Sequence, residues 1–112
     1  MKAKHRLTWR FPDGRTQDGP GYSSLNLLAH AEIDGLALPQ ACGGQAECGT
    51  CRIRVVSGEV TPALGDELEL RSRHAKRFES NERLACRARP RADLVVEIRR
   101  KAPPDLRDLA GE

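Results

Sequence analysis

Apolar residues alternate with polar residues in the first strand-length segment of the chain. Within residues 5–11, Leu7, Trp9 and Phe11 occupy every second position. Successive side chains of a β-strand point to opposite faces, so this period predicts a half-buried strand. The Pro-Asp-Gly run at 12–14 predicts a turn, because proline presets φ and glycine reaches positive φ without strain.

The next two predicted elements are a short strand and a helix. A second strand starts at Arg15 and is expected to break early, because residues 18–21 read Asp-Gly-Pro-Gly. Helical spacing follows, with Ser23 or Ser24 as the N-cap and Gly35 as the C-cap. The helical spacing is carried by four apolar residues, which are Leu25, Leu28, Ala29 and Ile33.

Three more strands and a second helix are predicted in the second half. The strands cover residues 52–56, 84–89 and 93–99, and the helix covers residues 66–77. The inward-facing residues of the second helix are expected to be Leu64, Leu68 and Leu70. Those of the last strand are expected to be Val95, Val96 and Ile98. This order of elements predicts an α+β fold in which a mixed sheet packs on one main helix.

The composition indicates one small, water-soluble domain. The chain has 112 residues, of which 38% are hydrophobic and 31% charged, and its mean hydropathy is −0.59. No apolar run approaches the roughly 20 residues that span a bilayer. The N-terminus lacks the apolar segment of a signal peptide, so we expect a cytoplasmic location. Residues 1–101 are assigned to one domain, and 102–112, with two prolines, to a flexible tail.

Positive charge is concentrated in one part of the sequence. The formal net charge is +3, yet residues 71–91 hold eight basic and two acidic side chains. Such asymmetry favours an acidic partner surface or nucleic acid as the binding partner. Phe78 alone interrupts the stretch with an aromatic ring, which argues against nucleic acid. Ordinary solvated surface arginines are the simpler alternative.

All four cysteines belong to one pattern. Five residues separate Cys42 from Cys48, two separate Cys48 from Cys51, and thirty-four separate Cys51 from Cys86. A disulfide pair fits the even number of cysteines but not a reducing cytoplasm. A structural zinc site with four cysteine ligands fits the ligand type, although zinc ribbons use two close cysteine pairs. Three thiolates from one loop and a distant fourth are the layout of a plant-type [2Fe–2S] cluster, which the pattern therefore favours.

The residues between the first three cysteines favour the same site. Gly43, Gly44, Ala46 and Gly49 leave little side-chain volume in this loop. Glycine allows the tight turns of a loop around a cluster, and it lets backbone N–H groups approach the sulfur atoms. A flexible surface loop would explain the glycines alone, but not their combination with the cysteine spacing.

The run at 42–51, followed by Arg-Ile-Arg-Val at 52–55 and Arg-Leu-Ala-Cys at 83–86, resembles the [2Fe–2S] ferredoxin family. The five-residue first gap is similar to the adrenodoxin-type branch and to bacterial redox modules. The resemblance implies a β-grasp (ubiquitin-like) fold over about residues 4–100, a [2Fe–2S] cofactor, and one-electron transfer without catalysis by the chain itself. By motif match, the cluster ligands are Cys42, Cys48, Cys51 and Cys86.

The resemblance also implies redox partner proteins, with one departure from the adrenodoxin pattern. Adrenodoxin-type proteins present an acidic helix between the third and fourth ligands to basic partners. Here the acidic residues give way to basic ones, which are Arg71, Arg73, Lys76 and Arg77. We expect a monomer that binds neither nucleic acid nor membrane, and that meets a flavin-type reductase and an oxygenase or other acceptor with an acidic docking face. The alternatives are a redox-sensing module and, more distantly, a structural zinc module.

Arginines flank the predicted ligands. Arg52 and Arg87 directly follow cysteines, and Arg54 and Arg89 lie two residues further along. We hypothesise that their positive charge raises the reduction potential of the cluster, because it stabilises the added electron. Ordinary outward-facing strand arginines are the alternative.

Overall fold

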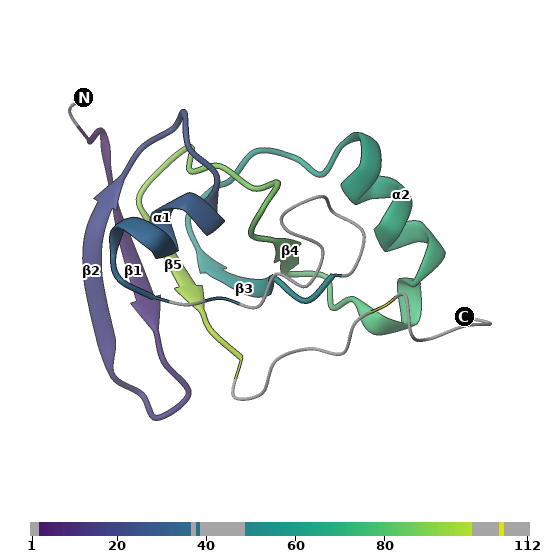
Figure 1. Cartoon of the computed structure of the whole chain (residues 1–112), viewed down its shortest axis with the longest axis horizontal. Coiled ribbons are helices and arrows are strands. Elements are labelled where there is room, and N and C mark those ends of the chain that lie inside the picture. The colour runs from purple at the N-terminus through teal and green to yellow at the C-terminus, as the bar shows by residue number, and fades with distance from the viewer. Residues whose placement is uncertain (1–2, 37, 39–48, 100–105, 107–112) are drawn as a thin grey trace.

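The first and last strands of the described chain lie side by side in a five-stranded sheet (Figure 1). Our computed structural model describes residues 3–36, 38, 49–99 and 106. In this part of the chain, no helix has the length and apolar character needed to cross a bilayer. The elements are β1 (His5–Arg10), β2 (Thr16–Gly21), α1 (Leu27–Ile33), β3 (Arg52–Ser57), α2 (Gly65–Arg73), the 3-10 helix η1 (Ala75–Arg77), β4 (Glu82–Leu84) and β5 (Leu94–Glu97).

The sheet is mixed and has the strand order β2-β1-β5-β3-β4. β1 pairs with β5 in parallel, with Leu7 opposite Leu94. β1 pairs with β2, β3 with β5, and β3 with β4, all in antiparallel fashion. In Figure 1, α1 lies across the β1–β5 part of the sheet, while α2 lies at the β4 end. The predicted α+β class with a mixed sheet is therefore confirmed.

The core lies between the sheet and α1. Leu7 and Trp9 of β1 are fully buried, as their alternation predicts, and Phe11 is partly buried at the edge of the same cluster. Trp9 also satisfies its only side-chain donor, since its Nε1–H donates to Asp34 Oδ2 at 2.8 Å. Leu27 of α1 is fully buried in this cluster. One aromatic side chain thereby anchors the helix end to the sheet.

The early break predicted in the second strand is wrong. β2 continues through Pro20 to Gly21, because it forms the edge of the sheet and needs no hydrogen bonds on its outer side. Gly19 packs closely there: a Cβ atom at this position would lie 2.5 Å from Asp34 Oδ2, so the Asp34 side chain would have to move. The glycine and proline residues therefore belong to the strand and do not end it.

The first helix begins later than predicted. Its N-cap is Asn26, whose Oδ1 accepts a hydrogen bond from Ala29 N–H at 2.7 Å, and not Ser23 or Ser24. Ile33 was assigned to the apolar face, yet 53% of its surface is exposed. The predicted end is confirmed, since α1 stops just before Asp34-Gly35 and Gly35 adopts φ +75°.

The inward face of the second helix was also predicted incorrectly. Leu64 and Leu68 are 68% and 50% exposed, whereas Leu70 is buried as expected and Glu67 is 1% exposed. The Glu67 carboxylate accepts hydrogen bonds from Arg83 Nε and Nη2 at 2.8 and 2.7 Å, and from Leu84 N–H at 2.9 Å. A buried ion pair thus fixes the rotation of α2. The helix ends at Arg73, and η1 follows as a separate turn.

The strand predicted at 84–89 is misplaced, because β4 covers Glu82–Leu84, and β5 is shorter than the predicted 93–99. β4 ends at Leu84, so Cys86 lies in the turn that follows it. In β5 the buried residues are Leu94 and Val96, because the inward alternation begins one residue earlier than expected. The prediction is right for Val96 and wrong for Val95, which is only partly buried.

We predict that Glu67→Ala lowers the free energy of unfolding by about 3–5 kcal/mol, because it leaves the buried Arg83 guanidinium without its carboxylate. Glu69→Ala on the same helix is the matched control. Glu69 pairs with Arg73 in an exposed ion pair, so its loss is expected to cost less than about 1 kcal/mol. Urea unfolding followed by far-UV circular dichroism measures both values. Equal losses in the two variants would contradict the assignment.

Candidate metal centre

Two of the four predicted ligands meet in the described structure. The Sγ atoms of Cys51 and Cys86 lie 3.6 Å apart, each residue is 3% exposed, and neither is in a disulfide. Two sulfurs bound at about 2.3 Å to one tetrahedral metal would lie about 3.8 Å apart. The pair therefore fits two ligands of a single metal ion.

The register of β3 and β4 brings these cysteines together. Arg52 lies opposite Leu84 in the antiparallel ladder, and Ala85 N–H donates to Cys51 O at 3.2 Å just beyond it. Each cysteine is thus one or two residues outside the last ladder pair, on the same end of the two paired strands. Strand pairing therefore brings together two cysteines that are far apart in sequence.

Cys42 and Cys48 lie outside the described residues. Within residues 3–36, 38, 49–99 and 106, no group of three or more His, Cys, Asp or Glu side chains is positioned to hold a metal ion. The complete set of four thiolates therefore stays a prediction, and its described half is the Cys51–Cys86 pair.

The first turn of α1 holds the segment that carries Cys86. Asn26 Nδ2 donates to Cys86 O at 3.1 Å, while the N–H groups of Leu27 and Leu28 donate to Ala88 O and Ala85 O at 2.9 and 3.0 Å. The first N–H groups of a helix have no acceptor inside the helix, so they are available for this contact. Sequence reasoning missed this role of Asn26, because two serines nearby offered equally good caps.

The turn before Cys51 is fixed by a glycine and an arginine. Gly49 adopts φ +70°, and a Cβ atom there would lie 2.6 Å from Leu106 Cδ1. Arg52 donates to Gly49 O through both its backbone N–H, at 3.4 Å, and its side-chain Nε, at 2.9 Å. Leu106 is 1% exposed, and the rest of the predicted tail lies outside the described residues.

Arg52 is buried rather than outward-facing. It is 3% exposed, its Nη1 donates to Arg77 O at 2.5 Å, and its guanidinium lies 5.1 Å from the centroid of the Phe78 ring. Burial lowers the pKa of Arg52 from its ordinary value. Arginine nevertheless keeps its proton in proteins, so a buried positive charge lies directly after Cys51.

Arg87, which follows Cys86, has a different environment. Its Nε and Nη2 donate to Asp66 at 3.0 and 2.9 Å, and its side chain is 34% exposed. These hydrogen bonds raise the pKa of Arg87 and lower the pKa of the Asp66 carboxyl. The Asp66 carboxylate therefore offsets part of the positive charge of Arg87.

Comparison with known proteins decides which metal site this is. The family described as the 2Fe-2S iron-sulfur cluster binding domain matches residues 11–91. The chain belongs to this family. Its cofactor is therefore a [2Fe–2S] cluster and its role is that of a ferredoxin-type electron carrier, which leaves the zinc alternative without support.

Curated relatives of this ferredoxin domain are longer proteins. One subunit of the Na(+)-translocating NADH-quinone reductase of Neisseria meningitidis serogroup C is 35% identical over 74 residues, which are 64% of this chain and 17% of that protein. The subunit of the same name in Chlamydia pneumoniae is 35% identical over 77 residues, which are 68% of this chain and again 17% of that protein. The chain thus spans about a sixth of the length of these relatives.

A solved structure of similar size supports the β-grasp fold. The ferredoxin of Rhodopseudomonas palustris HaA2 is 26% identical, with a TM-score of 0.70, and the match covers 87% of this chain and 98% of that one. The fold class implied by the resemblance, a β-grasp ferredoxin, is confirmed.

We predict that Arg52→Gln lowers the midpoint reduction potential by more than Arg87→Gln does. Arg52 is buried beside Cys51, where solvent screens its charge weakly, whereas Asp66 offsets the charge of Arg87. The expected shift for Arg52→Gln is on the order of tens of millivolts. Spectroelectrochemical titration of the purified ferredoxin measures it.

Arg52→Lys is the control for this prediction, because it keeps the charge and changes the hydrogen bonds to Gly49 and Arg77. Its potential should stay closer to that of the unaltered protein. A larger shift in Arg87→Gln than in Arg52→Gln would show that burial does not decide the effect.

Proposed function

We propose that this ferredoxin carries single electrons on a [2Fe–2S] cluster held by Cys42, Cys48, Cys51 and Cys86, between a flavin-type reductase and an oxygenase or other oxidoreductase. The observation that carries the proposal is the convergence of two buried thiols at 3.6 Å inside a domain of this family. The bound cluster supplies a centre that gains and loses one electron.

The residues of the chain hold the ligands and balance charge. Asn26 and the first turn of α1 fix the Cys86 segment through three backbone carbonyls. Arg52 fixes the turn at Gly49 and supplies positive charge beside Cys51. Rigid ligands limit the structural change that accompanies electron transfer, and nearby positive charge stabilises the electron-rich state.

The partners are expected to be redox proteins. Domains similar to this one occur in subunits of bacterial Na(+)-translocating NADH-quinone reductases, which supports a place next to NADH or quinone chemistry. The basic residues between Arg71 and Arg91 favour partners with an acidic docking face. We propose that the carrier acts as a monomer in the cytoplasm.

We predict that anaerobically purified protein is red-brown, bleaches on reduction with dithionite, and gives the electron paramagnetic resonance signal of a reduced [2Fe–2S] centre. Iron and acid-labile sulfide should each be present at about two atoms per chain. Cys42→Ser and Cys86→Ser should lose most of both, whereas Thr50→Ser, a change inside the same loop, should keep them. A colourless protein containing zinc, or full cluster content in both cysteine variants, would overturn the proposed ligand set.

A carrier and a redox sensor differ in their kinetics. A carrier is reduced by a flavoprotein reductase and reoxidised by an acceptor within many rapid cycles, and it forms short-lived complexes in both oxidation states. A sensor binds its partner in one oxidation state only and exchanges electrons slowly. Stopped-flow reduction by the reductase, combined with partner binding measured in both states, separates the two.

A further inference from the structure

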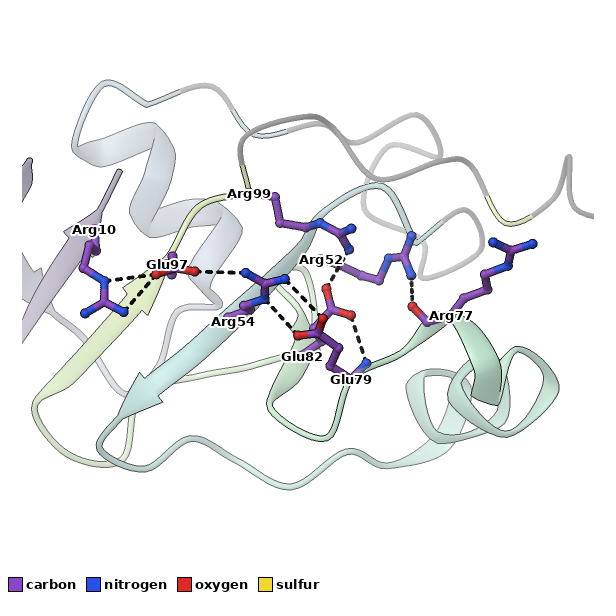
Figure 2. Close-up of polar contacts among 8 residues, drawn as sticks. All are labelled: Arg10, Arg52, Arg54, Arg77, Glu79, Glu82, Glu97 and Arg99. Atoms are coloured by element: carbon purple, nitrogen blue, oxygen red, sulfur yellow. Dashed lines mark hydrogen bonds and ion pairs between the residues drawn. The ribbon is translucent and has the colours of Figure 1, made fainter. Parts of the chain in front are cut away.

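A cleft of about 250 Å³ opens next to Arg52. Among the described residues, its charged lining consists of four cations and two carboxylates, which are Arg52, Lys76, Arg77, Arg99, Glu79 and Glu82. These residues come from β3, η1, β4, the link between η1 and β4, and the segment after β5, and Figure 2 shows most of them together. We call this feature the basic cleft.

The two carboxylates of the basic cleft are already engaged by the protein. Glu82 is 1% exposed and accepts hydrogen bonds from Arg99 Nη1 at 2.7 Å and from Glu79 N–H at 3.0 Å. Glu79 binds Arg54 through both carboxylate oxygens, at 2.9 and 3.2 Å (Figure 2). Arg54 also pairs with Glu97. The negative charges of the cleft are therefore balanced from inside the molecule.

Within the part of the chain that the structure describes, cations outnumber carboxylates in the basic cleft and give it an excess of positive charge. Lys76 and Arg77 are exposed at the end of η1. Phe78 also lines the cleft, and the guanidinium of Arg71 lies 5.2 Å from the centroid of its ring. Several positive side chains around one concave surface attract anions more strongly than the same charges dispersed over the molecule.

The basic cleft is directly connected to the metal centre. Arg52 lines the cleft, follows Cys51 in sequence, and donates to the carbonyl of Gly49 in the predicted ligand loop. A protein bound in this cleft therefore contacts the residue that directly follows a predicted cluster ligand in sequence. The β1–β2 hairpin, at the opposite side of the sheet, offers no comparable proximity (Figure 1).

We propose that the basic cleft is the docking site for an acidic segment of the redox partner. Asp or Glu carboxylates of this segment contact Lys76 and Arg77 at the rim of the cleft and face Arg52 inside it. This inference rests on the proposed function, because it names the surface through which the carrier meets its partner. Complementary charge speeds the encounter and fixes the orientation of the partner. The contact is therefore sensitive to ionic strength.

The first test uses small oxidants of opposite charge on the reduced holo-protein in stopped-flow experiments. Ferricyanide is the anionic probe and hexaammineruthenium(III) the cationic one. The double variant Lys76→Glu with Arg77→Glu should slow oxidation by ferricyanide about tenfold at low salt, and speed oxidation by the ruthenium complex. Raising the ionic strength should bring the variant and the unaltered protein together.

The matched control is Lys4→Glu with Arg15→Glu, which changes the net charge by the same amount. Lys4 is exposed before β1, and Arg15 lies in the β1–β2 turn with its side chain 82% exposed. This control should change either rate by less than about twofold. Equal effects of the two double variants would overturn the proposal, because net charge and not the cleft would then govern the encounter.

The second test measures binding, without electron transfer. Poly-L-glutamate is titrated into the oxidised holo-protein by isothermal titration calorimetry, with a DNA duplex of similar charge as the competing class of ligand. Salt-sensitive binding of polyglutamate that is lost in the cleft variant and kept in the control supports the proposal. Tighter binding of the duplex than of polyglutamate overturns an acidic protein segment as the occupant.

The cluster spectrum separates failure of this inference from failure of the proposed function. Protein that lacks the visible spectrum of a reducible [2Fe–2S] centre contradicts the carrier function, and the docking site with it. Protein with an intact, reducible centre whose oxidation rates are equal in the cleft variant and the control contradicts the docking site alone.

Discussion

Antiparallel pairing of β3 with β4 is the constraint on which the metal centre depends. The pairing sets Arg52 opposite Leu84, and this register places Cys51 and Cys86 with their sulfurs 3.6 Å apart. A slip of one residue would turn every side chain of one strand to the other face. The path of the 34 residues between the two cysteines can therefore vary, provided that the short β3–β4 ladder keeps its register.

Buried charge maintains that arrangement as much as apolar packing does. The chain contains one Trp, one Tyr and two Phe, so large rings contribute little to the core. Glu67 joins α2 to β4 through Arg83, and Glu82 of β4 pairs with Arg99. Such pairs add little net stability compared with apolar contacts, but they penalise any packing that separates the partners. In this molecule they define where the helix and the short strand lie.

The sequence reveals the parts of the structure that depend on local period and spacing. The alternation at Leu7 and Trp9 predicts β1, and the cysteine spacing predicts the family and its cofactor. The burial of residues that pair with partners distant in sequence could not be predicted from local patterns. From the sequence alone, Leu64 and Leu68 are better candidates for a buried helix face than Glu67. Glu67 is buried because it pairs with Arg83, which is distant in sequence. Likewise, nothing local distinguishes the buried Arg52 from the partly exposed Arg54 on the same strand.

The parallel pairing of β1 with β5 has a consequence for biosynthesis. Of the described strands, β5 is the last to be synthesised, yet it occupies the centre of the sheet and contacts both β1 and β3. The nascent chain thus exposes two unpaired strand edges until residue Glu97 has left the ribosome. Contacts so distant in sequence form slowly, because a long loop must close before they can be made. The completed sheet thus depends on a strand that is made after both of the strands it pairs with.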